Sequence, residues 1–301
     1  MKNKKLTFIG LGVMGYPMAG HLKKNNYDVT VYNRTSSKAE NWVNQFKGSF
    51  ESSPGKASTN SDIVFICVGR DKDLREVMEG NDGIINNVKE NTIIVDHTTA
   101  SANIAREYYE ISKKKKIHFL DAPVSGGQAG AENGQLSIMV GGDKEPFDKI
   151  KSVLLSYGKA IELIGKSGSG QLTKMINQIC IAGLVQGLAE GIHFAKAVGL
   201  DVEAVIETIS KGAAQSWQME NRYKTMNDNF FDYGFAVDWM RKDLAIALEE
   251  ARANQAHLPV AALVDQFYSE VQALGGNRWD TSSLIARLEA MKNGNSSKSK
   301  S

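Results

Sequence analysis

The chain has 301 residues, a length that corresponds to about two domains at roughly 150 residues each. Its 36 Lys and Arg residues nearly balance its 34 Asp and Glu residues, which gives a formal net charge of +2. So small a charge argues against a protein that coats nucleic acid or an anionic membrane. Two cysteines, Cys67 and Cys180, are too few for a disulfide framework and predict a reducing, cytoplasmic compartment.

Hydropathy predicts no membrane-spanning segment, because no run of about 18 consecutive residues is apolar. Lysines at positions 2, 4 and 5 precede an apolar stretch, as in a signal peptide. Glycines and a proline interrupt that stretch between Gly10 and Pro17, so it is better interpreted as a strand, a tight turn and a helix.

The first part of the chain is predicted to be an α/β domain, over residues 1–166. Short apolar runs alternate with amphipathic stretches, which indicates βαβ units around a buried, mostly parallel sheet. The predicted strands are 6–10, 29–32, 63–68, 92–96, 117–121 and 136–141, and the clearest predicted helices are 16–24, 38–46 and 103–113.

The second part, residues 167–292, is predicted to be an all-α domain. A glycine- and serine-rich junction at 165–170 is followed by 171–198, a mostly apolar stretch without proline that predicts one long interdomain helix. Few charges fall on this helix, so we expect it to be buried against a partner subunit in a homodimer or homotetramer. The polar residues 293–301 are expected to be disordered.

A glycine motif connects the first predicted strand to the first predicted helix. In a G-x-G-x-x-G loop the first glycine makes the tight turn, the second allows close approach of a pyrophosphate, and the third allows close helix–strand packing. The pyrophosphate then lies at the helix N-terminus. The motif predicts a Rossmann-type dinucleotide-binding domain, with the cofactor held by Gly10, Leu11, Gly12, Val13, Met14 and Gly15.

The end of the second predicted strand favours NADP over NAD. An NAD-binding protein places a carboxylate here to hold the ribose 2′-OH, whereas an arginine accommodates the 2′-phosphate of NADP. This chain has Asn33, Arg34 and Thr35 and no carboxylate. The alternative interpretation is that Arg34 is a solvated loop residue.

Four further segments, taken together with residues 8–19, resemble motifs of the β-hydroxyacid dehydrogenase family. The motifs occur in the same order as in that family, and the resemblance extends from about residue 5 to about residue 290. The family includes 3-hydroxyisobutyrate dehydrogenases and tartronate, glyoxylate and succinic semialdehyde reductases. The segments are Asp96-His97-Thr98-Thr99, Asp121-Ala122-Pro123-Val124-Ser125-Gly126-Gly127, Gly168-Ser169-Gly170-Gln171-Leu172-Thr173-Lys174-Met175-Ile176-Asn177-Gln178 and Arg241-Lys242-Asp243.

The resemblance implies hydride transfer between a nicotinamide cofactor and a small β-hydroxyacid or the matching semialdehyde. It makes Lys174 the general acid/base, and it implies a substrate carboxylate site and further cofactor contacts. The implied substrate residues are Ser125, Gly126, Gly127, Asn177 and Gln178, and the further cofactor residues are Val68, Gly69, Thr99 and Lys242. Relatives often have Asn where this chain has Gln178, and no role is assigned to His97.

The local pattern around Lys174 leaves two interpretations open. A lysine in a dry cleft beside a nicotinamide cation has a lowered pKa, which suits proton transfer. A lysine near a helix end also extends its ammonium to solvent in many proteins. The resemblance favours catalysis over two alternatives: a dinucleotide-binding module without activity, which we expect to lack the lysine, and an imine reductase, which replaces it. The five histidines have no zinc-site spacing, so no metal is expected.

Overall fold

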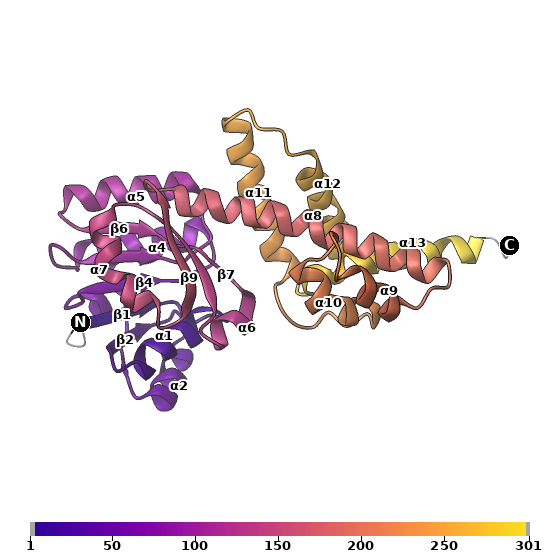
Figure 1. The fold of residues 1–301 in the computed structure, drawn as a ribbon. Coiled ribbons are helices and arrows are strands. Elements are labelled where there is room, and N and C mark those ends of the chain that lie inside the picture. The colour runs from indigo at the N-terminus through magenta and orange to yellow at the C-terminus, as the bar shows by residue number, and fades with distance from the viewer. Residues whose placement is uncertain (1–3, 299–301) are drawn as a thin grey trace. The chain divides into compact units, whose positions relative to one another are not determined.

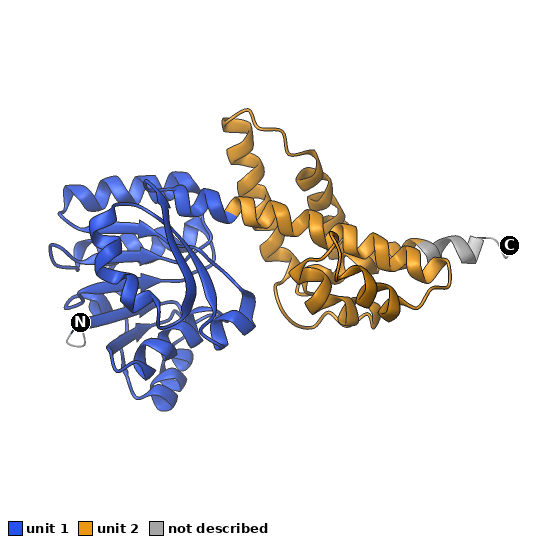
Figure 2. Ribbon diagram, in the orientation of Figure 1, with its two compact units in different colours: residues 1–174 blue, residues 175–301 orange. Residues whose placement is uncertain are grey.

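The computed structural model describes residues 4–298, and it describes side chains for residues 4–291. Two compact units divide the chain, residues 1–174 and residues 175–301 (Figure 2). The sequence predicts the domain boundary after Lys166, within the same segment as this division. The structure includes the first turn and a half of the following helix in the first unit, because backbone N–H groups of Gly168 and Gln171 bind Asp121 of the sheet.

The first unit is a nine-stranded sheet with helices on both faces (Figure 1). Its strands are β1 (Lys5–Ile9), β2 (Asp28–Tyr32), β3 (Ser49–Phe50), β4 (Ile63–Ile66), β5 (Ile93–Asp96), β6 (His118–Asp121), β7 (Val124–Ser125), β8 (Leu136–Gly141) and β9 (Gly158–Gly165). Its helices are α1 (Gly15–Lys24), α2 (Ser36–Phe46), α3 (Pro54–Ser58), α4 (Asp71–Glu79), the 3-10 turn η1 (Ile84–Asn86), α5 (Ala102–Lys114), α6 (Gly127–Glu132) and α7 (Lys144–Leu154).

The strand order β3-β2-β1-β4-β5-β6-β8-β7, with β9 beside β8, confirms the predicted sheet. Strands β1 to β6 pair in parallel, and β8 pairs antiparallel with β6 and β7. Each of the six predicted strands overlaps an observed one. Strands β3 and β7 were not predicted because a strand of two residues is too short to show a hydropathy pattern. Strand β9 was missed although its sequence alternates around buried Ile161, as an outer strand does.

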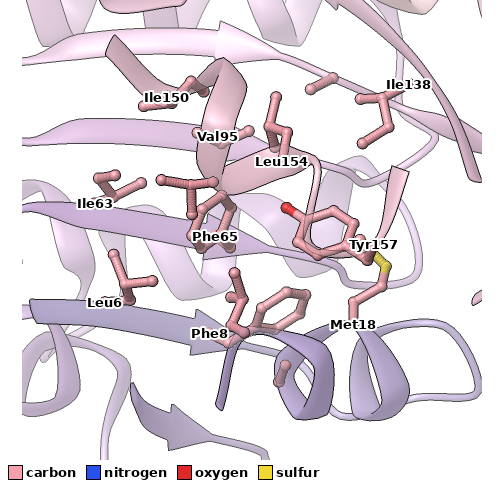
Figure 3. Packing of buried hydrophobic residues seen from close by; sticks show 14 of the residues in the cluster. Leu6, Phe8, Met18, Ile63, Phe65, Val95, Ile138, Ile150, Leu154 and Tyr157 are labelled. Atoms are coloured by element: carbon pink, nitrogen blue, oxygen red, sulfur yellow. The ribbon is translucent and has the colours of Figure 1, made fainter. Parts of the chain in front are cut away.

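Alternate residues of each central strand enter different cores. Phe8, Phe65 and Val95 pack under α1, α2 and α7, together with Tyr157 (Figure 3). Ile66 and its neighbours pack under α4 and α5 on the opposite face. Both faces are therefore covered, which explains why the strands are near-continuous apolar runs.

The second unit is helical, as predicted. Its elements are the continuing part of α8 (Ser169–Ala197), α9 (Val202–Ile209), α10 (Trp217–Asn227), α11 (Val237–Ala253), α12 (Pro259–Ala273), the 3-10 turn η2 (Thr281–Ser283) and α13 (Leu284–Lys298). Helix α8 has 29 residues, which confirms the prediction of one long helix. Helix α13 extends into the stretch expected to be disordered, since adding residues to an existing helix is inexpensive; residues 299–301 lie outside the described residues.

Among the described residues, α8 alone has the length and composition of a membrane span, with a mean hydropathy of 1.3 over its most apolar window. The sequence prediction missed this property because it required an uninterrupted apolar run, and polar residues such as Asn177 and Gln186 interrupt α8. Buried Val185, Ala189 and Ile192 pack in the core of the second unit. Core helices of globular proteins have the same composition.

Candidate functional site

The carboxyl ends of five parallel strands lie at one edge of the sheet in the first unit. Strand register aligns Tyr32, Ile9, Ile66, Asp96 and Asp121 in a single row. The chain leaves β1 toward β2 on one side, and β4 pairs with β1 on the other, so the strand order reverses beside β1. In open α/β sheets ligands bind outside the carboxyl ends of the strands at this point of reversal.

The glycine loop lies at this reversal point, and its three glycines have different surroundings. Gly10 has φ +96°, and a Cβ there would lie 2.2 Å from the carbonyl oxygen of Cys67. A Cβ on Gly15 would lie 2.0 Å from the carbonyl oxygen of Gly10. A Cβ on Gly12 would meet no atom within 4 Å. The loop therefore fits a dinucleotide, because Gly12 leaves open space beside the N-terminus of α1.

The loop after β2 holds the glycine loop in place. The Asn33 side-chain oxygen accepts a hydrogen bond from the backbone N–H of Leu11 at 2.9 Å, and its amide nitrogen donates to the carbonyl of Thr35 at 3.0 Å. The Arg34 side chain is 76% exposed, and its guanidinium lies 3.5 Å from Asp73 and 3.9 Å from Glu76 of α4. Arg34 is therefore accessible to a ligand and only loosely paired.

The loops after β4 and β5 are joined through Thr98. Its hydroxyl oxygen accepts a hydrogen bond from the backbone N–H of Val68 at 3.1 Å. The Asp96 carboxylate accepts one from the backbone N–H of Thr98 at 2.9 Å. Burial raises the pKa of Asp96 to about 7, and its second carboxyl oxygen has no hydrogen-bond partner among the described residues.

Gln171, which sequence reasoning did not assign to the site, binds the backbone on both sides of Thr99. Its side-chain nitrogen donates to the carbonyl of Thr98 at 2.7 Å, and its side-chain oxygen accepts from the N–H of Ala100 at 3.1 Å. Both backbone neighbours of Thr99 are thus fixed by one side chain. The only sequence signal was the position of Gln171 three residues before Lys174.

The first turn of α8 is anchored on the sheet edge by Asp121. Its two carboxylate oxygens accept backbone N–H groups of Gly168 at 2.7 Å and Gln171 at 3.0 Å. Burial is the largest influence on this carboxyl group and raises its pKa, while these hydrogen bonds oppose the shift. Lys174 follows Gln171 by one helical turn and is buried, with 8% of its surface exposed. The lysine is thus not the solvent-exposed helix-end residue of the alternative interpretation.

Beyond β6 the chain forms the short strand β7 and then turns sharply at two glycines. Ser125 pairs with Ser137 of β8. Gly126 has φ +136° and Gly127 has φ +62°, in the range that favours glycine. Both glycines are exposed and follow Ser125 directly, and successive backbone N–H groups at such a turn are suited to binding an anion.

The remaining predicted residues form a polar chain inside the second unit. Asn177 donates to the side-chain oxygen of Gln178 at 2.8 Å, and Gln178 donates to Asp243 at 2.6 Å. The Lys242 ammonium lies 3.0 Å from the other oxygen of Asp243. Gln178 is 2% exposed, whereas Asn177 is half-buried. Asp243 is the residue of this group to which sequence reasoning gave no role.

Comparison with known proteins agrees with this architecture. A family model described as the NAD binding domain of 6-phosphogluconate dehydrogenase matches residues 5–165. A second, described as the NAD-binding of NADP-dependent 3-hydroxyisobutyrate dehydrogenase, matches residues 168–288. The chain belongs to the β-hydroxyacid dehydrogenase family. Family membership and the fold, a Rossmann-type domain followed by a helical domain, are therefore confirmed.

Individual relatives cover nearly the whole chain. An uncharacterized oxidoreductase of Shewanella frigidimarina is 65% identical over 285 residues, 95% of this chain and 98% of that protein. A probable 3-hydroxyisobutyrate dehydrogenase-like protein of Arabidopsis thaliana is 38% identical, over 97% of this chain and 87% of its own. A structure of Mycobacterium tuberculosis 3-hydroxyisobutyrate dehydrogenase with L-serine has a TM-score of 0.87 and 25% identity, covering 95% of this chain and 99% of that one. This chain is accordingly an NAD(P)-dependent oxidoreductase similar to 3-hydroxyisobutyrate dehydrogenase.

Proposed function

We propose that this protein is a cytoplasmic, NADP-preferring enzyme that interconverts a small β-hydroxyacid and its semialdehyde. The observation that carries the proposal is the buried Lys174, one turn beyond a helix start that Asp121 fixes to the ligand-binding edge of the sheet. When bound, the nicotinamide supplies or accepts the hydride. The protein's part is to hold substrate and cofactor and to move one proton.

Lys174 is the general acid/base of this proposal. In the reducing direction its ammonium donates a proton to the carbonyl oxygen as the alcohol forms, and in the oxidising direction its neutral amine accepts the hydroxyl proton. The hydrogen bonds that the backbone N–H groups of Gly168 and Gln171 donate to Asp121 fix the start of α8 and so restrict the position of the Lys174 backbone. A fixed starting point favours the short donor–acceptor distance that proton transfer requires.

Ser125, Gly126 and Gly127 bind the substrate carboxylate in this proposal, and Asn177 binds a polar group of the substrate. Gln178 is a supporting residue, because its amide nitrogen is used by Asp243 and its oxygen by Asn177. The proposal therefore assigns the substrate contact to Asn177 and not to Gln178. Lys242, paired with Asp243, is proposed to contact the cofactor.

Arg34 is proposed to bind the 2′-phosphate of NADP. Its guanidinium is largely exposed, and ion pairs of 3.5 and 3.9 Å at a surface contribute little stability. Separating the Arg34 guanidinium from Asp73 and Glu76 therefore costs little free energy. A phosphate group binds a guanidinium more strongly, through two parallel hydrogen bonds.

We also propose that the enzyme is a homo-oligomer that contacts its second copy through α8. Its outward side chains Ile176, Leu184 and Phe194 recur at helical spacing and are 61, 45 and 65% exposed. A Cβ on Gly187 or Gly191 of this face would meet no atom within 4 Å, so another helix could approach closely. This band is more apolar than a solvent-facing helix surface normally is.

The test of the proposed function measures NADPH oxidation with glyoxylate, succinic semialdehyde, methylmalonate semialdehyde and tartronate semialdehyde. With the best of these, we expect Lys174→Met to lower kcat by at least about 10²-fold while the NADPH Kd stays within about twofold. Exposed Lys166, which precedes α8, supplies the matched control Lys166→Met, which should retain wild-type kcat. A wild-type protein that binds NADPH but reduces none of the four compounds would contradict the proposal and favour a binding module without activity.

A further inference from the structure

His97 is a buried histidine that the proposed mechanism does not use, and it lies between two rings of the first-unit core. It follows the last residue of β5, and 2% of its surface is exposed. Its ring stacks on Phe65 with centroids 5.9 Å apart and contacts the edge of Tyr157 at 5.6 Å. Figure 3 shows Phe65 and Tyr157 in this core. An apolar side chain would fill such a position without the cost of burying two ring nitrogens.

Both ring nitrogens are hydrogen-bonded, and their partners assign the tautomer. Nδ1 lies 2.6 Å from the carbonyl oxygen of Ala122, which only accepts, so Nδ1 carries the hydrogen. Nε2 then accepts from the Tyr157 hydroxyl at 2.9 Å. Burial lowers the pKa of His97 to about 4, so the ring is neutral near pH 7 and keeps this arrangement.

The backbone of Ala122 is thereby held at both its N–H and its carbonyl by two consecutive residues at the end of β5, Asp96 and His97. Its N–H donates to the carbonyl of Asp96 at 2.7 Å, and its carbonyl accepts from His97. The next residue, Pro123, has no N–H and accepts from the N–H of Met139 at 3.1 Å. The chain then enters β7 and reaches Ser125 three residues after Ala122.

We propose that His97 is a positioning residue that fixes Ala122 and so orients Ser125, Gly126 and Gly127 toward the substrate carboxylate. The proposal rests on the proposed function for the role of these three residues. It goes beyond that function because it connects two parts of the proposed site. The loop that holds Ala122 through His97 also binds the proposed cofactor residue Val68 through the hydroxyl of Thr98. His97 transfers no proton in this assignment.

The experiment compares His97→Asn with His97→Phe. The side-chain nitrogen of Asn occupies the position of Nδ1 and can still donate to Ala122, whereas Phe keeps the ring and loses both hydrogen bonds. We expect His97→Phe to raise the KM of the best semialdehyde about tenfold or more, the effect of one lost buried hydrogen bond, with kcat within about threefold. The KM of His97→Asn and the NADPH Kd of both variants should stay within about threefold of wild type.

Amide hydrogen exchange of residues 122–127 provides a second readout that needs no substrate. Exchange should be about tenfold faster in His97→Phe than in wild type and unchanged in His97→Asn, while Tyr157→Phe, which keeps the Ala122 bond, should resemble wild type. If His97→Phe does not fold, His97→Gln replaces it, because its nitrogen occupies the Nε2 position and does not reach Ala122.

Two results would overturn the proposal: unchanged exchange and KM in His97→Phe, or equal losses in the Asn and Phe variants, which would show that keeping the hydrogen bond to Ala122 does not keep the loop in place. If the wild-type enzyme reduces none of the semialdehydes, the proposed function fails. The exchange comparison then still decides whether His97 holds this loop.

Discussion

The neutral, buried state of His97 makes the first unit sensitive to acid. The pKa of its imidazole is lowered from 6.5 to about 4, and burial is the main cause. Between these values the unfolded chain binds a proton that the folded protein does not bind. The free energy of unfolding should therefore fall as the pH is lowered from about 6.5 to about 4, and this part of the stability is fully present above pH 6.5.

The size of the effect follows from the pKa difference. At 1.36 kcal/mol for each pKa unit, a change from 6.5 to about 4 corresponds to about 3 kcal/mol. Asp96 acts in the opposite direction in the same range. Burial raises its pKa from 3.8 to about 7, so the folded state binds the extra proton and stability falls as the pH rises through this window.

Because the two groups oppose each other, the measurement must isolate His97. Urea unfolding of wild type and His97→Asn should be compared between about pH 4 and pH 7.5, at constant ionic strength and without cofactor. Trp42 is fully buried in the first unit and reports its unfolding by fluorescence. Both proteins would carry phenylalanine in place of the three second-unit tryptophans, Trp217, Trp239 and Trp279.

The stability of wild type minus that of His97→Asn should increase by about 3 kcal/mol from pH 4 to pH 7, because Asp96 titrates in both proteins and its contribution cancels. A difference that is independent of pH, or that decreases with rising pH, would refute the reasoning. It would mean that the folded protein accepts a proton on His97 as readily as the unfolded chain does.

Three other predictions concern the cofactor, the substrate and the assembly. Arg34→Ala should weaken NADPH binding by roughly 10- to 150-fold, the value of a charged phosphate contact, and NADH binding by much less; calorimetry with both cofactors checks this, and equal losses would contradict the 2′-phosphate role. Asn177→Ala should raise the substrate KM about tenfold, whereas Gln178→Leu should chiefly lower the melting temperature, because it leaves buried Asp243 without its amide partner. Phe194→Asp should lower the molar mass in light scattering at micromolar concentration, and a wild-type monomer would contradict the oligomer proposal.

The elements that sequence predicted well are those with a local signal. The run from Ile63 to Ile66 is fully buried because parallel strands are covered on both faces, and this appears in the sequence as uninterrupted apolar residues. The glycine loop is likewise recognised from a local motif: Gly15 is required by the carbonyl of Gly10 within the motif, although Gly10 itself is required by the carbonyl of distant Cys67. Helix α8 was predicted within two residues at its start and one at its end.

Features that depend on distant partners were not predictable in this way. His97 acquires its role only through Ala122 and Tyr157, 25 and 60 positions along the chain. Nothing in the sequence around Lys242 indicates that Asp243 forms an ion pair with it. The sequence also does not indicate that Asp243 accepts a hydrogen bond from Gln178, which lies 65 positions away. The membrane-like composition of α8 was overlooked for a different reason, since an average over a window tolerates the polar residues that a search for an uninterrupted run rejects.

The loop after β5 explains why several motifs of this enzyme belong together rather than acting as independent sites. Within the five residues 96–100, Asp96 and His97 hold the backbone of Ala122, the Thr98 hydroxyl accepts from the N–H of Val68, and the N–H of Ala100 donates to Gln171 at the start of α8. The loop after β4, the loop from Ala122 to Ser125 and the start of α8 are thus connected through one short segment. Substitutions in that segment should therefore be non-additive with substitutions in the loops it contacts, because contacting residues share one network. His97→Phe combined with Ser125→Ala should accordingly raise KM by less than the product of the two single effects, since a loop already displaced no longer presents Ser125 correctly.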